Sequence, residues 1–555
     1  MNESVFQAKA AATDSGETTN FQEKYFLVID DASGMRSSMR TTISTMGGVR
    51  IDMAGNGIEA INRLEQRSYD IILCDYDLGG GKDGQQLLEE IKHRRLVKNS
   101  TIFMMVTAER SYEKVVSAVE LAPDDYLIKP FAGQVLLLRL ERLAKKKTYF
   151  LPVYELMDKQ DYRSAIQACD KLLESSNQHQ IDLMRLKAEI CMMLGDYAQS
   201  GLIYELILSI REIPWASMGL AKSLYHRAQF GEAATIFEQV TKANPNYMEA
   251  YDWLAKSHTA AGDETTAQTA LMHATKKSPR TLHRRKTLGE IAYRNNDLET
   301  AQDSYEAVLE FGKNSSLTSP EDYANLSRVF IDMGDCDKAM TVMKDARKTF
   351  KNSPESLLHG AVMDSLALEK SGDKEAAKAE LNKAMGYFDQ NQARGGVSLD
   401  LSRACFQLGD EEAGKKIVQN YIKNNHDDKR IHRHAEDMFK KIGMHDVGKE
   451  IIRDSSRTVI TLNNQAVRLA QTGDLKGSVD LLMQAVAEYK ENSVVVLNAA
   501  HAILVYMQTQ GWDDDLAQAA RNYMSAVKAR DPDNQKCRIL SELYKDVARQ
   551  YGIKL

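Results

Sequence analysis

The chain has 555 residues, of which 43% are hydrophobic and 27% charged, and its formal net charge is −6. This length and ordinary globular composition predict roughly two to four domains, or one domain followed by a repeat array. The mild acidity excludes a global electrostatic attraction to nucleic acid, and no apolar run approaches the roughly 18 residues of a membrane span. We therefore expect protein partners, no nucleic acid or membrane partner, and a cytoplasmic location.

The six cysteines and the first 20 residues set two further limits. The cysteines are scattered without CxxC spacing, which argues against a zinc ribbon and against a disulfide framework. Residues 1–20 are mostly small and polar and lack a basic region followed by an apolar one. We predict that they form a disordered lead-in, with the first domain spanning residues 21–147.

Within residues 21–147, short apolar runs alternate with amphipathic segments, a pattern typical of parallel strands joined by crossover helices. Five strands are predicted, at residues 25–29, 50–54, 71–74, 101–106 and 126–128. Helices are predicted at residues 35–45, 57–65, 84–94 and 113–121, where apolar residues recur every three or four positions. The fold class expected here is α/β, a five-stranded doubly wound parallel sheet.

Five polar side chains fall where these predicted strands end. Asp30 and Asp31 follow the first strand, Asp75 the third, Thr107 the fourth and Lys129 the fifth. Because ligands bind at the carboxyl ends of strands in open parallel sheets, we expect one shared site. Three carboxylates can hold a hard divalent cation, and one of them can attack a phosphoryl group. A hydroxyl and an ammonium can then neutralise the resulting anion, so the pattern predicts a phosphorylation switch.

The strand-end segments resemble the receiver domain of bacterial response regulators over about residues 24–146. The alternative is an unrelated flavodoxin-like domain with incidental acids. The segments that carry the resemblance are Val28-Ile-Asp-Asp31, Leu73-Cys-Asp75, Val106-Thr-Ala108 and Tyr126-Leu-Ile-Lys-Pro-Phe131.

The resemblance implies that a sensor histidine kinase phosphorylates Asp75 in a Mg²⁺-dependent reaction. It also implies that Asp31, Asp75 and the backbone carbonyl of Asp77 hold the ion, with Asp30 acting through water. One departure from the family is a longer loop after the acceptor, with three successive glycines at residues 79–81. These glycines are not expected to cradle a phosphate, because no Gly-Lys-Ser/Thr and helix start follow them.

The resemblance further implies how the bound phosphoryl group is read. Lys129, Thr107 and Ala108 are expected to bind it, and Thr107 and Tyr126 to form the switch. The signal would reach the face made by the fourth helix, the fifth strand and the fifth helix, which is also a candidate homodimer surface. The alternative for Tyr126 is a half-buried sheet aromatic with no switching role.

After residue 147 the strand signals end and a 34-residue period begins. The repeated small residues, together with Gly-Asp turns that close one helix and open the next, resemble the tetratricopeptide repeat. We expect residues 148–555 to form an all-α solenoid of helical hairpins, most regular at about 215–350 and irregular after about 390. Two sets of small residues define the period: Ala221, Ala255 and Gly289, and Ala233, Ala267 and Ala301.

A solenoid of this kind is expected to bind a protein or peptide in its concave groove. Candidate groove residues on the first helices of the hairpins are Tyr251, Arg285, Asn325 and Arg328. The basic segment at 276–286 belongs to no recognisable nucleic-acid module, so it is interpreted as solvated or as lining a groove for an acidic peptide. Four histidines are interpreted as surface residues rather than a metal site: His426, His432, His434 and His445.

These observations predict a two-component response regulator whose phosphorylation state controls the protein interactions of its repeat domain. No enzymatic activity is expected beyond phosphotransfer to the receiver and autodephosphorylation. Residues 139–149 contain no Pro or Gly, so the fifth helix is expected to continue into the first repeat helix. The layout is similar to that of VieB-type regulators of Vibrio, which implies that the groove ligand is another regulator or the kinase itself. The alternative is a constitutive scaffold in which the receiver serves docking or dimerisation.

Overall fold

A computed structural model describes residues 20–79, 83–107, 123–175, 179–313, 315, 317–388, 395–532 and 534–553. The lead-in expected at residues 1–20 therefore lies outside the described residues except for Asn20, and so does the helix expected at 113–121. The chain divides between Leu183 and Met184 into two compact units. The boundary expected at residue 147 falls inside helix α5 (Gly133–Tyr149).

The first unit contains the predicted parallel sheet, preceded by a short 3₁₀ helix at Phe21–Glu23. Its strands lie in the order β2-β1-β3-β4-β5, and every neighbouring pair is parallel. The register pairs Ile29 at the end of β1 with Cys74 at the end of β3, which brings the following residues to the same edge. The strands are β1 (Tyr25–Ile29), β2 (Arg50–Ala54), β3 (Ile71–Cys74), β4 (Ile102–Thr107) and β5 (Asp125–Ile128).

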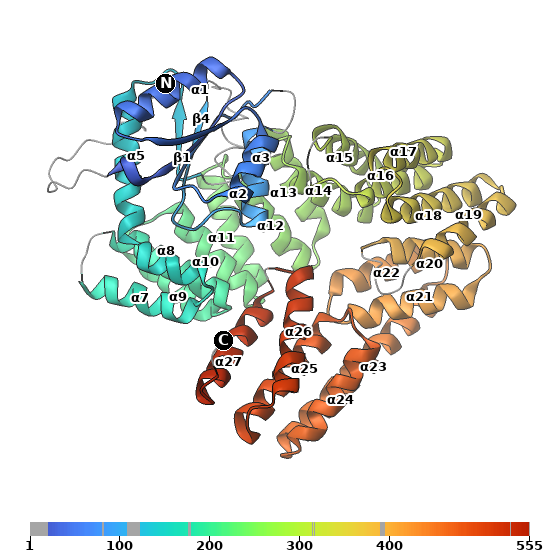
Figure 1. The fold of residues 1–555 in the computed structure, drawn as a ribbon. Coiled ribbons are helices and arrows are strands. Elements are labelled where there is room, and N and C mark those ends of the chain that lie inside the picture. Colours follow the sequence, from blue (N-terminus) through green and yellow to red (C-terminus); the bar gives the residue numbers. More distant parts are fainter. Residues whose placement is uncertain are drawn as a thin grey trace. The chain divides into compact units, whose positions relative to one another are not determined.

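Helices cover both faces of this sheet (Figure 1). Helices α1 (Ser33–Thr45) and α5 pack on one face, where Met39, Ile43 and Leu136 are buried. Helices α2 (Gly57–Gln66) and α3 (Gly84–Arg94) pack on the other. Both faces of each inner strand are therefore apolar, which confirms the expected doubly wound α/β fold.

The first unit also includes a helical hairpin that follows the sheet. The helix that ends the sheet domain does not continue into the hairpin as expected: α5 ends at Tyr149, and α6 (Leu151–Asp158) begins after Phe150. The break has a local cause, because Pro152 has no N–H to donate to the carbonyl of Thr148. Helix α7 (Tyr162–Ser175) packs back on α6. Helix α8 (Gln180–Leu194) then passes from the first unit into the second.

Polar contacts attach this hairpin to the sheet domain. The amide nitrogen of Asn99, in the loop before β4, donates to Asp158 at the end of α6 over 2.6 Å. Lys147 donates to the carbonyl of Asn99 over 2.8 Å and lies 3.0 Å from Asp124. Phe150 and Val153 are buried. The hairpin is therefore part of the same compact unit as the sheet.

The second unit is all helical, which confirms the expected α-solenoid class. Its regular part consists of helical pairs in which each helix packs on the next along the chain. The helices are α9 (Tyr197–Ile210), α10 (Pro214–His226), α11 (Phe230–Ala243), α12 (Met248–Ala261), α13 (Glu264–Lys277), α14 (Leu282–Arg294), α15 (Leu298–Phe311), α16 (Pro320–Met333), α17 (Cys336–Thr349), α18 (Pro354–Ser371), α19 (Lys374–Tyr387), α20 (Val397–Gln407), α21 (Glu411–Asn424), α22 (Lys429–Lys441), α23 (His445–Gln471), α24 (Leu475–Glu488), α25 (Ser493–Gln510), α26 (Asp514–Arg530) and α27 (Gln535–Gln550).

The small residues of the 34-residue period lie where helices approach most closely. Ala233, Ala267 and Ala301 are completely buried. At Gly289 in α14, a Cβ atom would lie 2.9 Å from the ring of Tyr305 in α15. The 34-residue pattern therefore marks the positions at which only a small side chain leaves room for the neighbouring helix.

The helix turns follow the expected capping chemistry, and the period fails where the helices lengthen. Gly262 ends α12 with a φ of +93°, and the Asp263 side chain accepts from the backbone of Thr266 to begin α13. Helix α23, by contrast, has 27 residues, about twice the length of α24 with 14. Among the described residues, no helix is both long and apolar enough to cross a membrane.

Candidate functional site

The two acids after β1 are held in place by backbone contacts. The Asp30 amide donates to the carbonyl of Ala54, and the Asp75 amide donates to that of Ile29 over 2.8 Å. The guanidinium of Arg36 in α1 donates to the carbonyls of Asp30 and Asp31, over 2.6 and 2.9 Å. The loop after β1 is therefore fixed by both the sheet and the first turn of α1.

Lys129 joins the acids that follow β1 and β3. Its ammonium nitrogen lies 2.7 Å from Oδ2 of Asp30 and 2.8 Å from Oδ2 of Asp75. The Lys129 and Asp30 side chains are both buried, and that of Asp75 is 12% exposed. Burial opposes the charge on Lys129, but its contacts with the two acids raise its pKa. Burial, with the nearby charge of Asp30, raises the pKa of Asp75 despite the contact with Lys129.

The three acids fit the expected cation. One oxygen from each of Asp30, Asp31 and Asp75 can be chosen so that all lie within 4.8 Å of one another. Carboxylate oxygens at such spacing suit a hard divalent ion, which would also offset their mutual repulsion. At Gly79 a Cβ would lie 3.3 Å from a carboxylate oxygen of Asp31, so the glycine leaves room beside this carboxylate.

Asp77 lies in the same loop as Gly79. Its side chain is exposed, and its carboxylate accepts from the backbone of Gly79 over 3.2 Å. This contact shapes the loop. The expected ion ligand from Asp77 remains its backbone carbonyl.

The receiver site was also predicted to include Thr107, Ala108 and Tyr126. Thr107 is the last residue of β4 and pairs with Ile128 of β5. Ala108 lies outside the described residues. Tyr126 is half-buried in β5 and packs against the core on the α2 and α3 face. The register thus places Thr107 in the strand next to the one that leads into Lys129.

Two residues that support the pocket were not singled out from the sequence. Arg36 acts on backbone carbonyls, so no side-chain pattern reveals it. At Gly84, the first residue of α3, a Cβ would lie 2.2 Å from the carbonyl oxygen of Asp75. A signal for Gly84 did exist, since Asp83 and Gln86 form a capping box that fixes the start of α3 beside the acceptor loop.

The four candidate groove residues have different surroundings in the second unit. Tyr251 is buried, and its ring stacks on His273 at 4.8 Å. Arg285 donates to the carbonyl of Pro279 over 3.1 Å. Asn325 and Arg328 contact one another over 2.7 Å. The structure therefore brings Asn325 and Arg328 together and places Tyr251 among the packing residues of its own hairpin.

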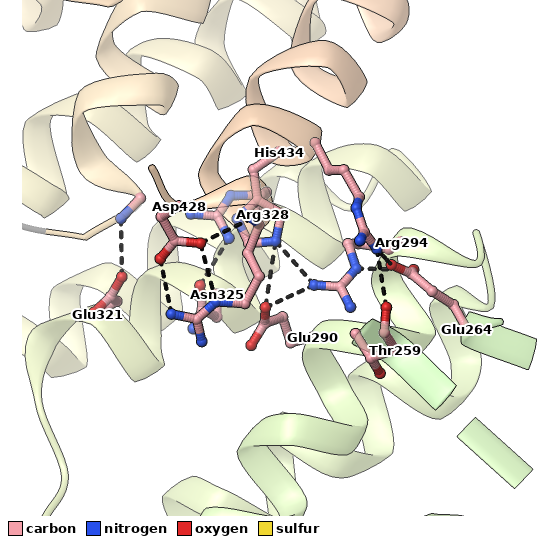
Figure 2. Close-up of polar contacts among 12 residues, drawn as sticks. Thr259, Glu264, Glu290, Arg294, Glu321, Asn325, Arg328, Asp428 and His434 are labelled. Carbon is pink, nitrogen blue, oxygen red and sulfur yellow. Dashed lines mark hydrogen bonds and ion pairs between the residues drawn. The ribbon is translucent and has the colours of Figure 1, made fainter. Parts of the chain in front are cut away.

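Arg328 belongs to a larger set of ion pairs in which helices α13, α14 and α16 meet α20 and α22 (Figure 2). We call this set the cross-helix cluster. Its members are Glu264, Glu290, Arg294, Arg328, Asp332, Asp400, Arg403, Arg433, His434 and Lys441.

One half of the cluster connects α14 to α22. Arg294 lies 2.9 Å from Glu264 and 2.8 Å from Glu290, and its guanidinium is 3.0 Å from the His434 ring (Figure 2). Arg433 of α22 donates to Glu264 and to the carbonyl of Thr259. Burial opposes ionisation of Glu290, but His434 and Arg294 lower its pKa to about 2.

The other half connects α16 to α20 and α22. Arg328 donates twice to Asp400, once over 2.9 Å. Asp332 pairs with Arg403 over 3.1 Å and with Lys441 over 2.7 Å. Burial disfavours the charge on Asp332, yet these two cations lower its pKa to about 2. Each carboxylate of the cluster thus has a cationic partner.

The basic segment at 276–286 is largely committed to local contacts. Arg284 pairs with Asp252 over 2.7 Å, and Lys286 with Asp322 over 2.8 Å. Lys277 donates to the carbonyl of Pro245, whereas Lys276 is exposed.

The four histidines do not form a metal site among the described residues, where the acids of the first unit are the one group that could hold an ion. His426 contacts Asn492, and His432 contacts Ser456. His434 contacts Arg294, and His445 is exposed at the start of α23.

Comparisons with known proteins agree with this architecture. Residues 26–141 match the response regulator receiver domain, and residues 218–280 match the tetratricopeptide repeat. Chemotaxis protein CheY of Pseudomonas aeruginosa is 27% identical over 120 residues, which are 22% of this chain and 95% of CheY. Transcriptional regulatory protein ResD of Bacillus subtilis is 33% identical over 131 residues, which are 23% of this chain and 52% of ResD.

A solved structure resembles part of the helical region. The C-terminal part of a TPR repeat-containing protein from Cytophaga hutchinsonii is 15% identical, with a TM-score of 0.37, and the match covers 45% of this chain and 99% of that one. Together with the two family matches, the fold identifies a response regulator receiver domain followed by tetratricopeptide repeats. The receiver interpretation of the first domain is therefore confirmed over the flavodoxin-like alternative.

Proposed function

We propose that this protein is a two-component response regulator in which a sensor histidine kinase phosphorylates Asp75. The observation that carries the proposal is the position of Lys129, whose ammonium lies between Asp30 and Asp75. A buried cation shared by two acids, beside a third acid, can stabilise the added charge of a phosphoryl group.

The chemistry follows from the charges in the pocket. A carboxylate oxygen of Asp75 attacks phosphorus, the bond to the donor nitrogen or oxygen breaks, and an aspartyl phosphate forms. Asp31, Asp75 and the carbonyl of Asp77 would hold Mg²⁺, with Asp30 acting through water, and the ion would supply charge neutralisation. The ammonium of Lys129 already contacts Asp75, so it can pair with the phosphoryl group once Asp75 carries it.

The signal leaves the pocket through the neighbouring strand ends. In this proposal, Thr107 and the backbone at Ala108 bind the phosphoryl group, and Tyr126 responds to the movement of Thr107. The register supports it, because Thr107 and Ile128 are paired and Lys129 follows directly. The face formed by β5 and α5 then becomes the surface for a kinase or for a second copy of the chain.

The repeat unit is the output in this proposal, and its ligand is a protein or peptide, such as another regulator or the kinase itself. Among the groove candidates, Arg285 is half-buried on the first helix of its hairpin. Arg328 is engaged by the chain's own Asp400 and also donates to Asn325, so a ligand at Arg328 must displace this carboxylate. Tyr251 contributes through the packing of α12 on α13.

Phosphorylation is tested by incubating the full chain with a small phosphodonor and Mg²⁺ and resolving the phosphoprotein by mass. The wild type is expected to gain one phosphoryl group, and Asp75→Asn none. Asp77→Asn is the matched control, because it removes a nearby carboxylate but keeps the backbone carbonyl. Phosphorylation of Asp75→Asn, or none of the wild type, contradicts the proposal.

The rival function is a constitutive scaffold in which the receiver serves docking or dimerisation. The two functions differ in how the captured partners depend on the phosphodonor. Equal capture by the phosphorylated wild type, the untreated wild type and Asp75→Asn favours the scaffold.

A further inference from the structure

A cationic surface that the pocket and the cross-helix cluster do not use lies on the first helices of three successive hairpins. It comprises Lys222 and His226 on α10, Trp253 and Lys256 on α12, and His283 on α14. We call these five residues the Trp253 surface. Four of them lie within residues 218–280, which match the tetratricopeptide repeat, and His283 follows directly after this match.

The Trp253 ring orders this surface. The ammonium of Lys256 lies 4.5 Å from the ring centroid, and that of Lys222 lies 5.4 Å from it. The His226 ring is 5.8 Å away. The indole also stacks on Phe237 of α11, with ring centroids 6.1 Å apart, and packs against the apolar core of these repeats. The cations are therefore gathered around a ring whose position is set by the core.

The charges of this surface are not balanced. Lys222 lies 2.5 Å from Glu249, but within the described part of the chain Lys256 has no hydrogen bond or ion pair. The nearby Asp252 is committed to Arg284, which it contacts twice over 2.7 Å. Burial and the neighbouring charge of Lys222 lower the pKa of Lys256, although Asp252 opposes this.

The charges of the two lysines also act on the neighbouring histidines. Burial lowers the pKa of His226, and the charges of Lys256 and Lys222 lower it further. Burial and the charge of Lys256 also lower the pKa of His283, against the effect of Asp252. The histidines are therefore less readily protonated, and the positive charge that an anion would meet is that of the two lysines.

We propose that the Trp253 surface binds an acidic segment of a partner protein, with Lys256 and Lys222 receiving its carboxylates. This inference rests on the proposed function and names the chemistry of the partner that the repeats receive. Carboxylates suit the site because each lysine offers a point charge on a flexible stem. The nearby arginine fork that would suit bidentate phosphate recognition, Arg284, is already paired and buried. The net charge of −6 also disfavours a polyphosphate backbone as the ligand.

The test measures the binding of fluorescein-labelled oligoglutamate to the full-length chain by fluorescence anisotropy. Oligoglutamine of the same length is the uncharged control and measures any binding that does not depend on carboxylates. Lys256→Gln is expected to weaken oligoglutamate binding about tenfold, the effect of losing roughly 1.4 kcal/mol. Lys222→Gln is expected to have a smaller effect, because Glu249 already neutralises part of its charge.

Lys276→Gln is the matched control, since it removes the same charge from an exposed position on α13. It is expected to leave binding unchanged, and circular dichroism checks that all variants are folded. The inference is overturned if oligoglutamate does not bind, if oligoglutamine binds equally well, or if Lys276→Gln weakens binding as much as Lys256→Gln. Tighter Lys256-dependent binding of a single-stranded oligonucleotide overturns the assignment to a protein.

The binding experiment is repeated with Asp75→Asn, which leaves the Trp253 surface intact. Loss of oligoglutamate binding by Lys256→Gln in both backgrounds supports the inference independently of phosphorylation. If the wild type is phosphorylated normally but no form of the chain binds oligoglutamate, the inference fails while the proposed function stands. If Asp75 is not phosphorylated, the proposed function fails whatever the peptide does.

Discussion

The receiver pocket and the cross-helix cluster both contain buried charged side chains, but they differ in how their charges are paired. In the pocket, Asp30 and Asp75 share one ammonium and Asp31 lies beside them, so a cation and a phosphoryl group can still be accommodated. In the cluster, Glu264, Asp332 and Asp400 each have a guanidinium or ammonium partner from another helix. Glu290 pairs with Arg294 of its own helix and with His434 of α22. The acids of the pocket can thus still take up a ligand, whereas those of the cluster are used in joining helices.

The largest effect is expected from removing the ammonium that Asp30 and Asp75 share. Lys129→Ala leaves Asp30 and Asp75 without their shared partner and should cost the receiver about 3 kcal/mol of unfolding free energy. Phosphorylation of Asp75 should slow by about 100-fold or more, because the phosphoryl charge loses its ammonium. Chemical denaturation and timed phosphorylation measure the two effects. Mg²⁺ should restore part of the stability, and an unchanged phosphorylation rate would contradict the role of Lys129.

Breaking one pair of the cross-helix cluster should cost a similar amount of stability without affecting phosphorylation. Arg328→Ala leaves Asp400 buried and unpaired, so we expect the second unit to lose about 3 kcal/mol. The double variant Arg328→Met, Asp400→Leu replaces both charges and should recover most of this loss. Thermal unfolding followed by circular dichroism tests both. If the single and double variants are equally unstable, the cluster does not act through charge pairing.

A buried histidine next to the cluster should make the second unit sensitive to acid. Burial lowers the pKa of His359 to about 4, with Asp400 opposing and Arg328 adding to the shift. The folded chain therefore takes up this proton less readily than the unfolded chain, and stability falls as the pH drops from about 6.5 toward about 4. The loss is roughly 3 kcal/mol at most, at about 1.36 kcal/mol per pH unit.

His359→Gln should flatten this pH dependence, as measured by urea denaturation across that range. His445→Gln is the control, because His445 is exposed at the start of α23. The explanation fails if the two variants retain the same slope.

The smallest effect concerns the acceptor itself. Burial and the Asp30 charge raise the pKa of Asp75, so its ionised form costs stability that is recovered as the pH falls. Asp75→Asn should therefore stabilise the receiver at neutral pH by about 1 kcal/mol. The difference from the wild type should close in mild acid, where Asp75 binds a proton. A thermal shift assay at both pH values measures it, and destabilisation at neutral pH would show that the Lys129 contact outweighs the repulsion.

Much of the pocket could be predicted from the sequence because its chemistry is local to strand ends. Asp30, Asp31, Asp75 and Lys129 each directly follow an apolar run, and parallel pairing brings these ends together. Arg36 could not be found this way, since it acts on backbone carbonyls.

In the repeats, the period predicted the close helix contacts but not the cross-helix cluster. Its contacts join residues far apart in the chain, such as Arg294 and His434, which are 140 positions apart. A sequence period predicts contacts between neighbouring repeats. The curvature that brings distant hairpins together is instead the sum of small packing angles between repeats. The predicted continuation of α5 was wrong because Pro152, just beyond residues 139–149, has no N–H to donate to the carbonyl of Thr148.

The attachment of the α6 and α7 hairpin to the sheet domain limits where the receiver can be recombined with another domain. A receiver that ends at residue 147 loses Asp158, the acceptor for the Asn99 amide, together with the buried Phe150 and Val153. A recombination event at that point would expose an apolar face on one product and leave the other without its support. A viable chimera should instead keep α6 and α7 with the sheet domain, so the segment that must be transferred together is longer than the sheet and its covering helices.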